Sequence, residues 1–273
     1  MDIFEGKTAI VTGGASGIGG ALGEEMASRG ALVTLADVNA ALLEEAVSSL
    51  KAKGYKVKGM ALDVIDFEAV KKLVDDTVSE HGRLDYMFNN AGIAIGGEAR
   101  DFSYDDWHRV IDTNLYGVVH GVAAAYPLMA KQGSGHIVNT SSLAGLAPAP
   151  GEISYTTSKY GVVGLSNALR IEGAHYGVKV SVVCPGFIRT PIYQNIEFVK
   201  MEREKVMKMA PQGMHPERCA RVILRGVERN KAIITVTAMA KAFWIVQRLS
   251  PGLVRAAFSQ GLFKPMHKAR SEQ

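Results

Sequence analysis

The chain has 273 residues, 47% of them hydrophobic, which allows one large α/β domain or two small ones with a sizeable core. No run of about 20 apolar residues occurs and the first residues lack a secretory pattern, which excludes a membrane-spanning helix and favours a cytoplasmic protein. Two cysteines are too few for a disulfide framework, and the seven histidines show no ligand spacing, so we expect no metal site.

The net charge of +4 is unevenly distributed along the chain. Residues 229–273 contain eight Lys or Arg and one Glu and carry +7, whereas residues 1–228 contain 23 Lys or Arg and 26 Asp or Glu and carry −3. Because the larger part is mildly acidic, the overall charge does not predict nucleic acid binding.

Short apolar runs alternate with helical patterns along the chain. The helices are predicted over residues 21–29, 40–53, 67–81, 104–132 (one or two helices) and 153–176. The strands are predicted over residues 7–12, 31–36, 56–62, 84–89, 136–141, 178–184 and 233–236. This alternation predicts parallel βαβ units in a doubly wound, Rossmann-like sheet with three α/β/α layers. We expect a single catalytic domain over residues 1–238, followed by a basic amphipathic extension over residues 239–273.

Polar or glycine-rich groups follow the predicted strands, where ligands bind in such sheets. These groups are residues 13–19, Asp37, Asp63, residues 89–92, Ser142 and residues 185–186. The first is T-G-G-A-S-G-I-G, placed between a strand and a helix, so its backbone can approach a pyrophosphate. We therefore expect a dinucleotide to contact Gly13, Ser16, Gly17, Ile18 and Gly19.

Asp37, eighteen residues beyond Gly19, is suited to accept hydrogen bonds from the hydroxyls of an adenosine ribose. Its carboxylate would repel a 2′-phosphate, and neighbouring Ala15 and Val38 supply no cation, which favours NAD over NADP. The alternative is that Asp37 caps the helix predicted from residue 40. Asp63 is a second acid at a strand end, suited either to the adenine amino group or to a simple turn.

Tyr155 and Lys159 are four residues apart, so on a helix both side chains lie on one face, and Ser142 follows a predicted strand. A free tyrosine has a pKa of about 10, and one ammonium at about 4 Å contributes roughly 4 kcal/mol, enough to bring that pKa near 7. The three side chains together predict proton exchange with an alcohol oxygen. The alternative is an ordinary pair on a helix surface.

Together these residues resemble the short-chain dehydrogenase/reductase family, in its main single-domain branch. The motifs are T-G-G-A-S-G-I-G, N-N-A-G, Asn114, the serines at 141 and 142, Y-T-T-S-K and P-G-F-I-R-T. The resemblance implies a catalytic tetrad of Asn114, Ser142, Tyr155 and Lys159, in which Asn114 holds a water and Lys159 also binds the nicotinamide ribose. It implies further cofactor contacts from Val64, Asn90, Ala91, Gly92, Pro185, Gly186, Ile188 and Thr190. It also implies a homotetramer or homodimer formed through the helices around residues 116–132 and 153–176.

Residues 187–214, rich in methionine, are expected to form a flexible lid over the substrate. The side chains expected to line the pocket are apolar, with Ser142 and Tyr155 at its reactive end and no arginine in place: Ile93, Ile95, Leu143, Ala144, Pro150, Ile153 and Phe187. They predict an apolar secondary alcohol or its ketone, steroid-like, fatty or aromatic, with Glu152 near a distal polar group. The alternatives are a 3-oxoacyl thioester reductase and a non-catalytic NAD-binding regulator.

The extension over residues 239–273 mixes cations with aromatic and leucine residues. Pro251, Gly252 and Pro265 are expected to break it into short helices. Three roles fit this pattern: packing against a partner subunit, covering the substrate pocket, or lying peripherally on an anionic membrane surface.

Overall fold

Seven parallel strands form the central sheet of the computed structural model, which describes residues 2–271. The strands are short apolar runs, and all five positions of the first are buried, as expected when helices cover both faces. The strands are β1 (Thr8–Thr12), β2 (Leu32–Asp37), β3 (Val57–Ala61), β4 (Tyr86–Asn89), β6 (Gly135–Thr140), β7 (Val178–Cys184) and β9 (Ile233–Thr235).

The strand order is β3-β2-β1-β4-β6-β7-β9, so the chain starts near the middle of the sheet and winds outward in both directions. Thr8 pairs with Leu32 and Thr12 with Ala36, which places the carboxyl ends of β1 and β2 at the same edge. The predicted doubly wound sheet is confirmed, and each strand begins and ends within two residues of its predicted limits.

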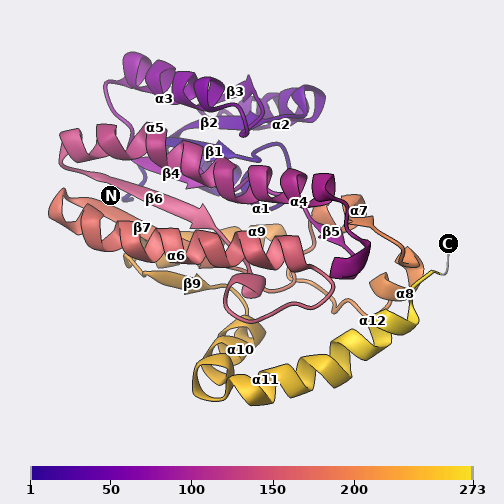
Figure 1. The fold of residues 1–273 in the computed structure, drawn as a ribbon. Helices are drawn as coiled ribbons and strands as arrows, with labels where there is room; N and C mark the ends of the chain where they lie inside the picture. The colour runs from indigo at the N-terminus through magenta and orange to yellow at the C-terminus, as the bar shows by residue number, and fades with distance from the viewer. Residues whose placement is uncertain (1, 272–273) are drawn as a thin grey trace.

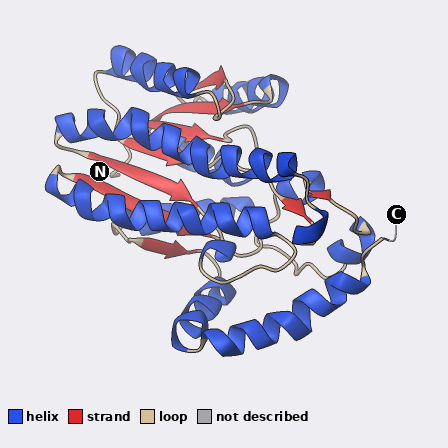
Figure 2. Cartoon of the chain, in the orientation of Figure 1, coloured by secondary structure: helices blue, strands red, loops and turns tan. Residues whose placement is uncertain are grey.

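Helices cover both faces of the sheet (Figures 1 and 2). On one face α1, α2 and α9 contribute Leu22, Leu43 and Ile223 to a buried cluster, and on the other α3, α5 and α6 contribute Leu73, Met129 and Leu169. The helices are α1 (Gly17–Ser28), α2 (Ala40–Ala52), α3 (Phe67–His81), α4 (Tyr104–Ile111), α5 (Gly117–Gln132), α6 (Ile153–His175), α7 (Ile192–Asn195), α8 (Arg203–Met207), α9 (Pro216–Glu228), α10 (Ala238–Leu249), α11 (Pro251–Phe258) and α12 (Lys264–Lys268).

The stretch predicted as one or two helices over residues 104–132 is one continuous helical segment with an irregular turn near its centre. A π-helical turn over Asp112–Tyr116 joins α4 to α5, and the backbone N–H of Gly117 donates to the carbonyl of Asp112. Such turns insert an extra residue into a helix and are frequent at functional sites. Here the turn carries Asn114, whose side chain is fully buried.

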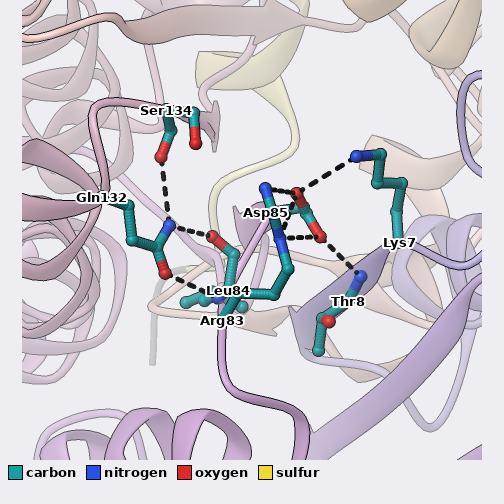
Figure 3. Close-up of polar contacts among 7 residues, drawn as sticks. All are labelled: Lys7, Thr8, Arg83, Leu84, Asp85, Gln132 and Ser134. Atoms are coloured by element: carbon teal, nitrogen blue, oxygen red, sulfur yellow. Dashed lines mark hydrogen bonds and ion pairs between the residues drawn. The ribbon is translucent and has the colours of Figure 1, made fainter.

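The amino end of the sheet, opposite the ligand edge, is held by a polar cluster around Asp85 (Figure 3). The buried Asp85 carboxylate accepts from the backbone N–H of Thr8 at 3.0 Å and pairs with the guanidinium of Arg83 at 2.6 Å. The Gln132 side chain accepts from the N–H of Leu84 at 3.0 Å and donates to its carbonyl at 2.9 Å. These bonds tie β1 and β4 to the end of α5.

The chain beyond residue 190 forms a strand pair with the body that the sequence did not predict. Two very short strands, β5 (Ile95–Gly96) and β8 (Glu197–Phe198), pair in parallel and attach the expected lid to the body.

In the tail, α10 ends before Pro251 as predicted, but the predicted break at Pro265 is wrong. A π-helical turn over Ser259–Phe263 carries α11 directly into α12, and Pro265 lies in the first turn of α12, where proline is tolerated.

Candidate functional site

A cleft of about 540 Å³ lies along the carboxyl edge of the sheet. Most of the predicted cofactor-binding and catalytic residues line it, from strands that the topology brings to one edge. The predicted residues in its lining are Gly13, Ser16, Gly17, Ile18, Asp37, Asp63, Val64, Asn90, Ala91, Gly92, Ser142, Tyr155, Lys159, Pro185, Gly186, Ile188 and Thr190. Gly19 and Asn114 lie behind this surface, within the supporting structure.

The glycine-rich turn between β1 and α1 is held close to the N-N-A-G segment. Gly13 has a φ of +63°, and a Cβ added there would lie 2.9 Å from the Cα of Ala91. A Cβ at Gly19 would lie 2.0 Å from the carbonyl oxygen of Gly13. No side chain fits at either position, so backbone lines this part of the cleft. Ser16 begins α1 without a side-chain capping bond, and a helix N-terminus of this kind attracts an anion.

Asp37 lies at the end of β2 and holds the neighbouring turns. Its carboxylate accepts from the backbone N–H groups of Ala15 and Asn39, each at 3.0 Å. The alternative that Asp37 caps α2 is wrong, because the side chain of Asn39 accepts from the N–H of Leu42 and is the cap. Asp63 accepts from the N–H of Ile65 at 3.1 Å, a turn contact that leaves it in the cleft lining.

Lys159 and Asn114 form a buried polar layer beside Gly92. The Lys159 ammonium donates to the carbonyl of Thr140 at 3.1 Å and lies 5.4 Å from the ring centroid of Tyr155. The Asn114 side chain accepts from the N–H of Ile93 at 2.8 Å and donates to its carbonyl at 2.9 Å. A Cβ at Gly92 would lie 3.0 Å from the Asn114 oxygen and 3.4 Å from the Lys159 nitrogen. The hydrogen bonds between Asn114 and Ile93 therefore hold the loop that follows β4 next to Lys159.

Burial dominates the ionisation of the reactive side chains. It raises the pKa of Tyr155 well above its ordinary value, while the Ser142 hydroxyl opposes the rise and the Glu152 carboxylate adds to it. Burial also lowers the pKa of Lys159 to about 8. The expectation that Lys159 brings the Tyr155 pKa near neutrality is wrong for this structure, because desolvation of the phenol is the largest influence on that pKa and raises it.

The residues predicted to bind substrate lie in several places. Ser142 and Tyr155 line the cleft, whereas Phe187 stacks on Tyr193 with ring centroids 5.9 Å apart, and Leu143 belongs to a short 3-10 helix, η3 (Leu143–Gly145). Ile153 lines a separate apolar cavity, also of about 540 Å³, that we call the tail cavity. Its lining is Glu98, Ala99, Arg100, Pro148, Ala149, Pro150, Gly151, Ile153, Thr156, Arg255, Phe258, Ser259 and Phe263. The predicted single substrate pocket is therefore divided by the loop that precedes α6.

The fold brings to the cleft several residues that the sequence did not predict there. The expectation of no arginine is wrong: Arg109 of α4 lines the cleft, and its guanidinium pairs with Glu197 of β8 at 2.5 and 2.9 Å. Tyr193 of α7 also lines the cleft. A weak signal was available for Glu197, since an acid within an apolar lid segment needs a partner, but nothing in the sequence pairs it with a residue 88 positions earlier.

The tail packs against both the loop before α4 and the expected lid. His267 contacts Glu98 at 2.5 Å and lowers the pKa of that carboxyl, and Arg270 pairs with Asp101 at 2.6 Å. The N–H of Glu202 donates to the carbonyl of Ala269 at 2.9 Å. The tail thus closes one side of the tail cavity. No helix within residues 2–271 combines the length and the apolar content needed to cross a bilayer.

Comparison with known proteins extends this description. The chain is 36% identical over 270 residues to SadH of Mycobacterium tuberculosis, named as an oxidoreductase, covering 97% of this chain and 98% of SadH. It is 36% identical over 223 residues to the 3-oxoacyl-[acyl-carrier-protein] reductase FabG of Thermotoga maritima, covering 81% of this chain and 90% of FabG. Because only the first alignment spans nearly the whole chain, the tail is shared with SadH.

A solved structure of a short chain dehydrogenase/reductase from Burkholderia phymatum, in complex with NAD, superposes with a TM-score of 0.84 at 30% identity. The superposition covers 93% of this chain and 96% of that one. The sequence profile of the short chain dehydrogenase family matches residues 7–199. The protein therefore belongs to the short-chain dehydrogenase/reductase family of oxidoreductases.

Proposed function

We propose that this protein is an NAD-dependent oxidoreductase that interconverts an apolar secondary alcohol and its ketone. The observation that carries the proposal is one continuous cleft with a glycine turn and Asp37 at one end and Ser142, Tyr155 and Lys159 at the other. This spacing of parts suits a dinucleotide that lies along the sheet edge with its reactive end at the tyrosine.

The residues present fit a dinucleotide. Gly13, Ser16 and Gly17 line the cleft at the start of α1, where the free backbone N–H groups of the helix suit a pyrophosphate. Asp37 is suited to the two ribose hydroxyls. The described lining contains two cations, Lys159 and Arg109, and the Arg109 guanidinium is already paired with Glu197. Without a free cation beside Asp37 in the described lining, a 2′-phosphate would be repelled, so NAD is favoured over NADP. The proposed amide contacts are Ile188 and Thr190.

The bound nicotinamide would donate or accept the hydride, and the protein would manage the proton. The high pKa of Tyr155 keeps its phenol protonated at neutral pH, the form that donates a proton to a carbonyl oxygen. Ser142 would hold that oxygen, and the interaction of its hydroxyl with the phenol supports this role. Lys159 would bind the nicotinamide ribose, and Asn114 would support the proton path behind it.

The substrate is proposed to be apolar because the cleft wall beside Asn114 consists of Ile93, Ala94 and Ile95, with Ile192 from the lid segment. A second candidate, reduction of a 3-oxoacyl thioester, is favoured by the likeness to FabG. Asp37 opposes it wherever that reaction requires NADPH. A non-catalytic NAD-binding regulator is the third possibility, and it would have no need for the tyrosine.

The test is turnover with a panel of apolar secondary alcohols and NAD, and of ketones with NADH, followed by absorbance of the reduced cofactor. Tyr155→Phe is expected to lower kcat at least 100-fold, because general acid–base catalysis contributes roughly 10²–10⁴-fold, while NADH binding measured by fluorescence stays within about twofold. Tyr160→Phe is the matched control, since Tyr160 lies on the same helix but is exposed.

The same assay separates the alternatives. Turnover of Tyr155→Phe within about threefold of the parent would contradict the proposed role of the phenol. Preference for a 3-oxoacyl thioester with NADPH would favour the second candidate. NAD binding without turnover of any substrate in the panel would favour the regulator.

A further inference from the structure

The elbow between α10 and α11 presents large apolar side chains to solvent. Ile245, Leu249 and Leu253 are 44%, 81% and 61% exposed, and we call these three residues the tail tip. In Figure 1 the two helices form a separate corner below the sheet layers. Leucine at this exposure loses the favourable burial that it has elsewhere in the protein.

Two residues of the tail tip, Ile245 and Leu249, lie on α10, and other side chains of this helix hold it to the body. Trp244 packs against the buried cluster around Val162, and Phe243 packs on Phe258 with ring centroids 5.0 Å apart. The outer face follows the helical spacing through Lys241, Ile245, Arg248 and Leu249. The exposed apolar residues are therefore not those that hold the tail to the body.

All the charged residues that the tail itself places around the tail tip are positive. Residues 232–271 contain no Asp or Glu, and Lys241, Arg248 and Arg255 form no ion pair with any residue among 2–271. The guanidinium of Arg248 lies 5.6 Å from the ring centroid of Trp244, which holds it near the same surface. The patch thus combines free cations with apolar side chains.

The combination of free cations and exposed apolar side chains favours one kind of partner over another. If a second copy docked through the same patch in a two-fold contact, its cations would face their own equivalents with no carboxylate on the tail to pair with them. An anionic lipid bilayer supplies both phosphate groups for the cations and acyl chains for the leucines. Each cation near such a surface contributes roughly 1 kcal/mol.

We propose that the protein docks on anionic membrane surfaces through the tail tip and its flanking cations. Leu249 and Leu253 enter the boundary between headgroups and acyl chains, and Lys241 and Arg248 contact the phosphates. Arg255 and Phe258 of the same helix line the tail cavity, so docking holds this apolar cavity beside the lipid. This proposal goes beyond the proposed redox function and does not depend on it.

The test is co-sedimentation of the full chain with vesicles of equal parts phosphatidylglycerol and phosphatidylcholine, and with phosphatidylcholine alone. Binding to the anionic vesicles is expected at about 0.05 M salt and is expected to weaken at least tenfold at about 0.5 M, because salt screens surface charges. Leu249→Glu with Leu253→Glu, and separately Lys241→Glu with Arg248→Glu, are each expected to lower binding at least tenfold.

Two matched controls separate the patch from general changes of charge and polarity. Ile3→Glu places a charge at an isoleucine ahead of β1 that is 48% exposed, and Lys51→Glu with Lys56→Glu changes the net charge as much as the tail pair does. Both are expected to sediment like the parent. Circular dichroism checks that every variant is folded.

Three results would overturn the proposal. The first is no co-sedimentation of the parent with anionic vesicles at low salt. The second is equal loss of binding in the tail variants and the controls. The third is a fall in oligomer mass for Leu249→Glu with Leu253→Glu in light scattering without lipid, which would show that a second copy covers the tail tip.

Discussion

Glu152 has a carboxylate whose ionisation the fold opposes, and this predicts a specific dependence of stability on pH. It lies just before α6, next to Tyr155 and Tyr193, and its carboxylate makes no hydrogen bond or ion pair within residues 2–271. Burial raises the pKa of this group from 4.5 to about 7. Because the folded pKa is the higher one, the folded state holds more protons between these values.

The sign of the effect follows from that difference. The contribution of Glu152 to the free energy of unfolding is fully present below pH 4.5 and is lost as the pH rises through 7. A shift of this size corresponds to at most about 3 kcal/mol, since each pKa unit is about 1.4 kcal/mol. Solvent reaching this half-buried residue reduces the value.

The perturbation is Glu152→Gln, which keeps the shape and removes the charge. At about pH 5 the folded parent is mostly protonated, so the two proteins are expected to unfold at nearly equal urea concentrations. At about pH 8 the glutamine variant is expected to be more stable by about 1–3 kcal/mol, because it has no buried charge to accommodate.

The difference between the two proteins is measured by urea unfolding at both pH values, which cancels the titration of every other group. Glu44→Gln, at an exposed position of α2, controls for the loss of a carboxylate. A stability difference that is the same at both pH values would refute the reasoning.

Four further outcomes are expected. Asp37→Ala combined with Val38→Arg should shift preference toward NADP at least tenfold, by removing a repulsion and adding a cation; a parent that already prefers NADPH in side-by-side titrations would contradict the role of Asp37. The kcat/KM of the parent should fall as the pH rises above about 8, where Lys159 loses its proton. Lys159→Ala should lack that decline, and a variant with the same pH profile as the parent would contradict this role of the lysine. Asp85→Ala should lower the free energy of unfolding by about 2–3 kcal/mol, because it strands the buried N–H of Thr8, whereas Asp76→Ala at an exposed ion pair should change it by less than about 1 kcal/mol in the same urea assay. Light scattering at micromolar concentration should give a homotetramer, and a single mass of 29.3 kDa would contradict it.

Local chemistry explains why the sequence alone predicts much of the cleft. The turn after β1 needs glycine because neighbouring backbone crowds it, and the glycines of the motif are visible in the sequence. Tyr155 and Lys159 share a face because helical geometry sets it. The order of parallel units brings the strand ends to one edge, so Gly13, Asp37 and Ser142 meet there without any long-range information beyond the alternation of strands and helices.

Only the tertiary structure decides what depends on burial and on contacts between distant segments. The expected effect of Lys159 on Tyr155 left out the burial of the phenol, and desolvation raises the phenol pKa instead. Arg109 meets Glu197 only because β5 pairs with β8. Ile153 lines the tail cavity and not the cleft, and the opposite wall of that cavity comes from the tail. Patterns along a chain specify local geometry, whereas solvation and long-range pairing arise only when the whole chain has folded.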